Sequence, residues 1–321
     1  MTINSQIAKS IEFYNEGVKY EKNKNFKLAE KYYLNAIKIN PNLFQAHYNL
    51  ANIKKNINEL NEAIFHFKKT IEHKPNFVNA YNNLGGVLKD LGELDHAEQN
   101  FKNAIKLNSE FKEAKINLES IIDLKRLTAI VKPSKQTNNK LNLISNSNTF
   151  KTFRIVENEL IDELYRLKIK ELDTEKNIYD ARFGDGKFSN FKLFDNNSSI
   201  IQKIKSDLTN IMQEAVKSEI YIKESFFNIL KAGSGTHIHN HISTFDRNFG
   251  YENQKFSLTY YLTIGDQEAS EPGVLKLYDP EKEILPKEGL LLIFPAHQRH
   301  SAVYNGKKDR VMIGVNFYSL N

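Results

Sequence analysis

The stretch PNLFQAHYNLANIKKNINELNEAIFHFKKTIEHKPN, Pro41–Asn76, holds two prolines, Pro41 and Pro75, that lie 34 residues apart. Small and aromatic residues recur at the same interval on both sides of it, in three series: Ala29, Ala63 and Ala97; Tyr33, Phe67 and Phe101; Gly17, Ala51 and Gly85. Self-similarity at a fixed period predicts stacked copies of one structural unit. The small residues let two helices of a unit approach closely, and the aromatic residues fill the space between neighbouring units.

This pattern resembles the tetratricopeptide repeat, with units at Ser10–Leu43, Phe44–Phe77 and Val78–Phe111. The third unit has Ser109 where the pattern has proline, and Lys112–Leu127 is predicted to form a terminal helix that covers the last apolar face. The resemblance implies an α-solenoid that binds a protein or peptide partner in its groove.

One polar series follows the same period, namely Asn15, Asn49, Asn83 and Asn117. A primary amide offers both a donor and an acceptor, so stacked asparagines could pair with the backbone of an extended peptide. These four residues are candidate peptide-binding residues. The alternative is that asparagine is simply common at this point of such repeats and throughout this chain.

The periodicity stops after residue 127, and residues 128–148 are polar and rich in Asn and Ser, which is typical of a linker. Helical spacing returns in Glu157–Leu172 and Ser198–Glu219, followed by short β-rich runs: FFNIL, THIHNHI, FSLTYYLTI, GVLKLY, GLLLIF, HSAVY and VMIGVNFY. Such runs behind two helices predict a jelly roll. We therefore expect a multidomain α and β protein: repeats over 1–127, a linker over 128–148, and a jelly-roll domain over 149–321.

The run GTHIHNHI, Gly235–Ile242, places three of the nine histidines of the chain at alternate positions, His237, His239 and His241. In a strand all three would leave from one face. The chain has no cysteine, so a metal would need nitrogen or oxygen ligands. The pattern favours a metal site over the alternative, a solvated face of an edge strand.

The C-terminal part resembles the iron(II)- and 2-oxoglutarate-dependent oxygenases of the prolyl-hydroxylase type, which have a double-stranded β-helix, and in particular a branch fused to tetratricopeptide repeats. The segments that carry the resemblance are GSGTHIHNH, LTYYL, GVLKLYDP and LLIFPAHQRHSAVYNGKKDRVMIGVNF. It implies Fe(II) as metal, 2-oxoglutarate and dioxygen as co-substrates, decarboxylation to succinate, and hydroxylation of a C–H bond.

In that family the metal ligands are His-x-Asp or His-x-Glu and a distant His. Here His239 matches the first ligand, His300 the distant one, and His241 stands where the carboxylate is expected. The interpretation is a site of His239, His241 and His300. A site with only two of them, one that recruits His237, and one in which a bulge returns Asp246 remain open.

Arg310 and Tyr261 match the residues that hold the far carboxylate of 2-oxoglutarate in the family. Arg310 stands between apolar strand residues, where an isolated guanidinium would be costly, so an anionic ligand accounts for it. The pair Asn305-Gly306 predicts a hairpin that sets His300 and Arg310 opposite each other on one face.

The segment Ser243–Phe256 is expected to overhang the mouth of the barrel and to select the substrate, or else to be a disordered connection. The expected function is hydroxylation of a protein or peptide side chain, with proline as one candidate. Two alternatives stay open: a cupin-like metal protein that does not use 2-oxoglutarate, and an inactive barrel carried by a repeat scaffold.

Basic and acidic residues nearly balance, with 45 Lys and Arg against 39 Asp and Glu and a net charge of +6. The lysines are scattered, so no nucleic-acid partner is expected. The N-terminal segment lacks the apolar core of a signal peptide, and no run is long enough to cross a bilayer. A cytoplasmic protein without a membrane partner is the expectation.

Overall fold

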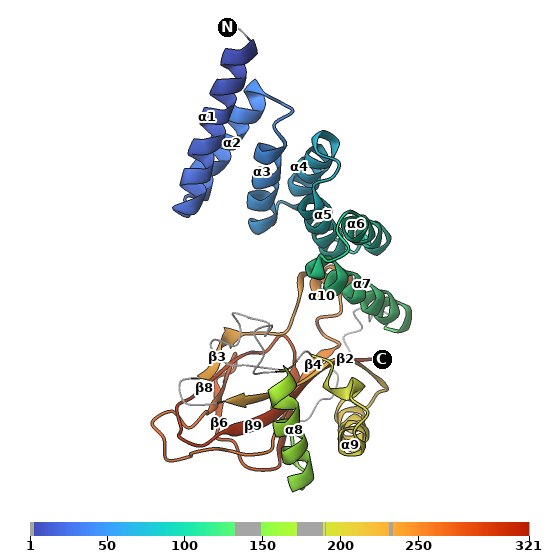
Figure 1. The fold of residues 1–321 in the computed structure, drawn as a ribbon. Coiled ribbons are helices and arrows are strands. Elements are labelled where there is room, and N and C mark those ends of the chain that lie inside the picture. Colours follow the sequence, from blue (N-terminus) through green and yellow to red (C-terminus); the bar gives the residue numbers. More distant parts are fainter. Residues whose placement is uncertain (1–2, 132–148, 172–188, 190, 231–233, 321) are drawn as a thin grey trace. The chain divides into compact units, whose positions relative to one another are not determined.

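The computed structural model describes residues 3–131, 149–171, 189, 191–230 and 234–320. It divides the chain into two compact units, Met1–Arg126 and Leu127–Asn321 (Figure 1). Residues 132–148, which form most of the predicted linker, lie outside the described residues. Among the helices that the structure describes, none is long and apolar enough to span a bilayer.

The first unit is a solenoid of antiparallel helix pairs, so the predicted repeats are confirmed. The helices are α1 Ile3–Lys22, α2 Phe26–Ile39, α3 Phe44–Asn56, α4 Leu60–His73, α5 Val78–Asp90, α6 Leu94–Leu107 and α7 Lys112–Ile130. The helix α7 continues to Ile130, three residues beyond the predicted end of the terminal helix.

The recurring small residues act as predicted, by close packing inside each pair. A methyl group added at Gly17 would come within 2.5 Å of the Tyr33 ring, and one at Gly85 within 2.7 Å of the Phe101 ring. Because the interior is close-packed, the aromatic ring leaves space only for glycine at these two positions.

The second unit contains two facing sheets, which confirms the predicted jelly roll. The five-stranded sheet has the order β1-β7-β4-β9-β2 and the four-stranded sheet the order β3-β8-β5-β6. The strands are β1 Phe150–Phe153, β2 Ile220–Leu230, β3 Ser234–His239, β4 Lys255–Tyr261, β5 Leu275–Tyr278, β6 Lys282–Ile284, β7 Leu290–Pro295, β8 Arg299–Tyr304 and β9 Arg310–Ser319.

Side-chain alternation along the five-stranded sheet separates a helix-facing core from an inner cavity. The helices α8 Asn158–Glu171 and α9 Ser199–Val216 pack on its outer face, where Phe227 and Ile229 of β2 join the main apolar core. Their neighbours Phe226, Asn228 and Leu230 line the cavity. One strand therefore supplies both the support of the barrel and the wall of the site.

Four short elements lie outside the predicted ones. They are β1, the 3-10 helix η2 Leu193–Asp195, β6 and the helix α10 Thr244–Phe249, which forms inside the segment expected to be a loop or a disordered connection. Ser243 begins α10 with a capping box, in which its hydroxyl accepts from the Asp246 N–H and the Asp246 carboxylate accepts from the Ser243 N–H. Gly250, at φ +69°, ends the helix.

Candidate metal centre and co-substrate pocket

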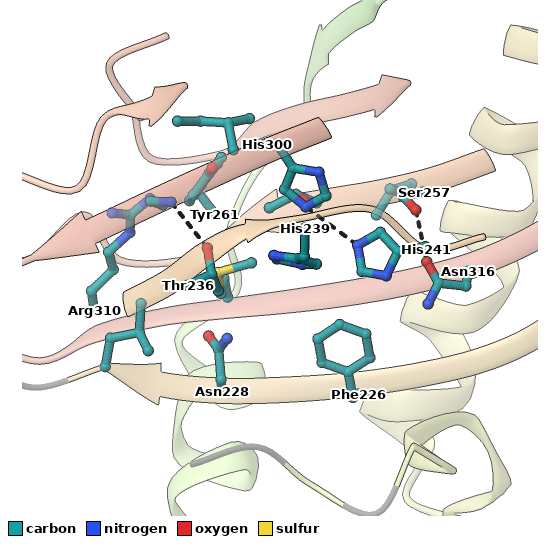
Figure 2. A pocket seen from close by; sticks show the side chains of 16 residues that line it. Phe226, Asn228, Thr236, His239, His241, Ser257, Tyr261, His300, Arg310 and Asn316 are labelled. Atoms are coloured by element: carbon teal, nitrogen blue, oxygen red, sulfur yellow. Dashed lines mark hydrogen bonds between the residues drawn. The ribbon is translucent and has the colours of Figure 1, made fainter. Parts of the chain in front are cut away.

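Three histidines meet inside the barrel (Figure 2). His239 is the last residue of β3, His241 follows two residues later, and His300 lies on β8 directly opposite His239. One ring nitrogen from each lies within 4.8 Å of the others, and the two Nε2 atoms of His241 and His300 are 3.3 Å apart. This spacing allows all three imidazoles to face one metal ion.

The backbone that brings them together differs from the predicted single strand face. A bulge between Thr236 and His239 interrupts the pairing of β3 with β8. His241 lies beyond the strand, and its N–H donates to the carbonyl of Ala296 at 2.9 Å. The alternation that suggested the site is therefore broken, and the hydrogen bond to the residue that follows β7 places the last histidine.

Local backbone contacts fix the tautomers that a metal site needs. Nδ1 of His239 lies 2.7 Å from the carbonyl of His237, and Nδ1 of His300 lies 3.0 Å from that of Gln298. A carbonyl only accepts, so in the neutral form of each ring Nδ1 carries the hydrogen and Nε2 keeps its lone pair. Burial and the charge of His239 lower the pKa of His300 to about 4, so His300 is neutral at pH 7.

The two alternative ligands lie elsewhere. The His237 side chain is exposed and is not part of the cluster. Asp246 is fully buried in α10, where Lys255 Nζ at 2.9 Å, the Tyr318 hydroxyl at 2.5 Å and Ser243 donate to its carboxylate. Burial raises the pKa of Asp246. The charge of Lys255 and these hydrogen bonds outweigh burial and hold this pKa below its ordinary value.

Arg310 is a fully buried cation in the same cavity as the histidines. Its Nη1 donates to the carbonyl of Gly273 at 2.7 Å, and its guanidinium carbon lies 4.8 Å from the centre of the Tyr261 ring. Its Nε has no hydrogen-bond partner, and no carboxylate of the described residues forms an ion pair with it. A buried guanidinium in this state is costly unless an anion pairs with it, which makes Arg310 a candidate anion-binding residue.

Two neighbours shape the surroundings of Arg310. Gly273 has φ +77°, and an added methyl group would overlap Nη1 of Arg310, so only glycine fits there. Burial raises the pKa of Tyr261 more than the charge and hydrogen bond of Arg310 lower it. Tyr261 therefore keeps its proton and can donate to a carboxylate.

The predicted hairpin between His300 and Arg310 is wrong. His300 is on β8, which pairs with β3 and β5, whereas Arg310 is on β9, which pairs with β2 and β4 in the other sheet. Asn305 and Gly306 do not form a turn, and the chain crosses between the two sheets over residues 305–309. The two side chains nevertheless line one cavity, from two different sheets.

The cavity has about 560 Å³ of empty space, part of it open to solvent, and it has polar residues that the sequence reasoning missed. They are Asn228, Thr236, Ser257, Thr259 and Asn316. Asn228 is 4% exposed, its Oδ1 has no hydrogen-bond partner, and its amide points into the cavity in Figure 2. The available signal was an asparagine inside an apolar strand, in FFNIL and in GVNFY.

Three of the four predicted peptide-binding asparagines form hydrogen bonds within the solenoid. Nδ2 of Asn49 donates to the Tyr33 hydroxyl at 3.0 Å, Nδ2 of Asn83 to Asn52 Oδ1 at 2.9 Å, and Nδ2 of Asn117 to Asn82 Oδ1 at 2.9 Å. Asn15 is exposed. These contacts give the series a role in joining neighbouring helices, whatever else it binds.

Comparison with known families agrees with this geometry. Residues 227–318 match the 2OG-Fe(II) oxygenase superfamily, and residues 13–43, 32–65 and 78–111 match tetratricopeptide repeat models. The chain thus joins tetratricopeptide repeats to a 2OG-Fe(II) oxygenase domain, a class of metal-dependent oxygenases named for its metal and its co-substrate. The predicted fusion is confirmed.

Three solved structures that are similar to part of this chain are repeat domains. The first repeat domain of Spaghetti (RPAP3) bound to an HSP90 peptide is 18% identical and matches 37% of this chain and 94% of its own, with a TM-score of 0.36. The second repeat domain of human RPAP3, in complex with an HSP70 peptide, is 21% identical and matches 38% of this chain and 98% of its own, with a TM-score of 0.35. The Arabidopsis OM64 repeat domain is 22% identical and matches 36% of this chain and 96% of its own, with a TM-score of 0.35. No curated protein matches the chain.

Proposed function

We propose that the second unit is an iron(II)- and 2-oxoglutarate-dependent dioxygenase that hydroxylates a protein or peptide side chain. His239, His241 and His300 would hold the metal, and Arg310 and Tyr261 would hold the far carboxylate of the co-substrate. When bound, the metal supplies the activation of dioxygen that the protein side chains cannot provide.

The observation that carries this proposal is the buried Arg310 in the same cavity as the histidine cluster. Three neutral imidazoles leave other coordination positions open for a keto acid and for dioxygen. The planar fork of the guanidinium, together with the Tyr261 hydroxyl, can grip a carboxylate at the far end. The donor set and the anion site thus fit a diacid that spans the cavity.

Each residue has a separate task. The backbone carbonyls of His237 and Gln298 keep Nε2 of His239 and His300 available to the metal. Arg310 neutralises the distal carboxylate, and Tyr261 orients it. The apolar walls, which include Leu258, Leu275 and Met312, exclude bulk water and strengthen this charge pairing.

The test is a titration of 2-oxoglutarate into the iron-loaded full chain and into Arg310→Gln, by calorimetry under nitrogen. Loss of one partner of a buried charge pair costs about 2–5 kcal/mol, so the affinity should fall by roughly thirty-fold or more. Iron content should not change. Equal affinities for the two proteins would contradict the proposal.

The cupin-like alternative has no need for a buried cation in the cavity, so the inward position of Arg310 favours the oxygenase. An inactive scaffold would show no iron-dependent conversion of 2-oxoglutarate to succinate. That assay, with and without iron(II), separates an active enzyme from both alternatives.

We also propose that the repeats recruit the substrate as a protein or peptide. Support comes from the repeat architecture, whose stacked helix pairs form concave surfaces suited to extended segments. A fragment that starts near Ser147 should still convert 2-oxoglutarate but should lose hydroxylation of a large substrate. A fragment that is folded yet inactive would mean that the barrel depends on the repeats.

A further inference from the structure

The residues that line the cavity extend along β9 beyond Arg310. Arg310 and Asn316, both on β9, face it at positions six residues apart, which corresponds to about 20 Å along a strand. In Figure 2 the three histidines lie between Arg310 and the pair formed by Ser257 and Asn316. A co-substrate held by Arg310 and the metal therefore leaves the Ser257–Asn316 end open.

That end is built from one rung of three neighbouring strands. Glu224 of β2 pairs in register with Asn316 of β9, which pairs in register with Ser257 of β4. A bulge between Ile222 and Glu224 sets the glutamate in this position. The Asn316 and Ser257 side chains are each 3% exposed, so their hydrogen bonds are shielded from water.

The direction of the hydrogen bonds in this rung is fixed by the carboxylate. Nδ2 of Asn316 donates to Oε2 of Glu224 at 2.7 Å, and a reversed amide would set two acceptors against each other. Oδ1 of Asn316 therefore faces β4 and accepts the hydroxyl hydrogen of Ser257 at 2.8 Å. Ser257 has no second hydrogen, so its oxygen can offer only lone pairs to the cavity.

We infer that the Ser257–Asn316 end is a substrate subsite that accepts a neutral hydrogen-bond donor, a carboxamide N–H, and rejects a carboxylate. This inference rests on the proposed function, which assigns the Arg310 end to the co-substrate. An incoming N–H can donate a hydrogen bond to the free lone pair of the Ser257 oxygen. A carboxylate would place its charge and lone pairs against this oxygen, which Glu224 keeps as an acceptor through Asn316. The ring of Phe226, which covers Gly314, forms the apolar side of the subsite.

The two ends of the cavity thus have opposite preferences. Arg310 attracts an anion, and the rung of Glu224, Asn316 and Ser257 repels one. The difference keeps a diacid from binding in the reverse direction and keeps an acidic side chain away from the metal. A glutamine or asparagine side chain matches the chemistry of the subsite.

The test compares two isosteric probes, N-acetyl-glutamine N-methylamide and N-acetyl-glutamate N-methylamide. Each is titrated into the full chain loaded with manganese(II) and saturating 2-oxoglutarate under nitrogen, and binding is measured from the paramagnetic broadening of the probe's proton signals. The glutamine probe should bind about ten-fold more tightly. Equal binding, tighter binding of the glutamate probe, or no binding of either would overturn the inference.

Two variants locate the effect. Glu224→Gln lets the Asn316 amide reverse and the Ser257 hydroxyl donate into the cavity, so the preference should shrink to within about three-fold. Ser257→Ala removes the acceptor and should weaken binding of the glutamine probe alone. If Glu224→Gln does not fold, Ser257→Ala by itself tests the subsite. Glu283→Gln, on the exposed side of β6, is the matched control and should keep the wild-type preference.

The affinity of each variant for 2-oxoglutarate separates this inference from the proposed function. Binding of 2-oxoglutarate with no probe preference would defeat only the subsite. Absence of 2-oxoglutarate binding to the wild type would defeat the proposed function itself. An unchanged preference in folded Glu224→Gln would show that the rung does not set it.

Discussion

His300 and Arg310 are ten residues apart in the sequence, yet they line one cavity from two different sheets. The chain leaves β8, crosses the end of the barrel and enters β9, so the proposed metal ligand and the proposed carboxylate anchor stand on facing walls. Substitutions on one wall should therefore affect metal binding and substitutions on the other wall co-substrate binding, each separately.

Replacement of His300 tests the metal site. His300→Ala removes one of three imidazoles and should weaken iron(II) binding by more than about a hundred-fold, since even supporting contacts of metal ligands are worth ten- to a hundred-fold. Elemental analysis after desalting measures it. The control is His297→Ala, an exposed histidine of the turn before β8, which should retain the metal. Unchanged iron content in His300→Ala would exclude this ligand set.

Replacement of Gly273 tests the anion site without touching its charge. In Gly273→Ala the new methyl group overlaps Nη1 of Arg310, so the guanidinium must move and 2-oxoglutarate affinity should fall at least about ten-fold. Gly250→Ala is a matched control because Gly250 also has a positive φ but faces open space. It should cost about 1 kcal/mol of stability and leave the affinity intact. The same affinity in both variants would argue against an anion site at Arg310.

Asp246 should matter for stability although it is not in the histidine cluster. Asp246→Asn leaves the buried Lys255 without its counter-charge, so the free energy of unfolding should fall by about 3–5 kcal/mol. Asp279→Asn removes an exposed ion pair with Arg299 and should cost less than about 1 kcal/mol. Urea unfolding of the two variants checks the difference, and similar losses would contradict the role of burial.

A buried pair of histidines should make the repeat unit sensitive to acid. Nδ1 of His47 and Nδ1 of His66 lie 2.9 Å apart, and burial, with the charges of His47 and Lys54, lowers the pKa of His66 to about 4. Between pH 6.5 and 4 the unfolded chain binds a proton that the folded chain does not. Stability is therefore complete above pH 6.5 and falls as the pH decreases toward 4, by on the order of 2–3 kcal/mol.

Urea unfolding as a function of pH, followed by the helical circular dichroism signal, measures this loss. His66→Gln should flatten the dependence, while His96→Gln, at an exposed position of α6, should leave it unchanged. A dependence that is the same in His66→Gln and in the wild type would assign the acid sensitivity to other groups.

The sequence predicts those features that repeat or that depend on residue type. The 34-residue period indicates the solenoid, and an arginine between apolar strand residues indicates an anion site. The bulge in β3 and the crossing from β8 to β9 are not predicted, because both depend on which strands pair. The Glu224–Asn316–Ser257 rung depends on the register of three strands far apart in the sequence, so no local pattern reveals it.

Because the site is divided between two sheets, the distance between the sheets can select the length of the bound molecule. Facing sheets pack roughly 10 Å apart, and their separation is set by the apolar residues between them, among them Leu275, Leu292 and Phe294. If the diacid reaches from the histidine wall to Arg310, that separation selects its carbon-chain length. Substitutions in this inner core should then shift the preference between shorter and longer keto diacids.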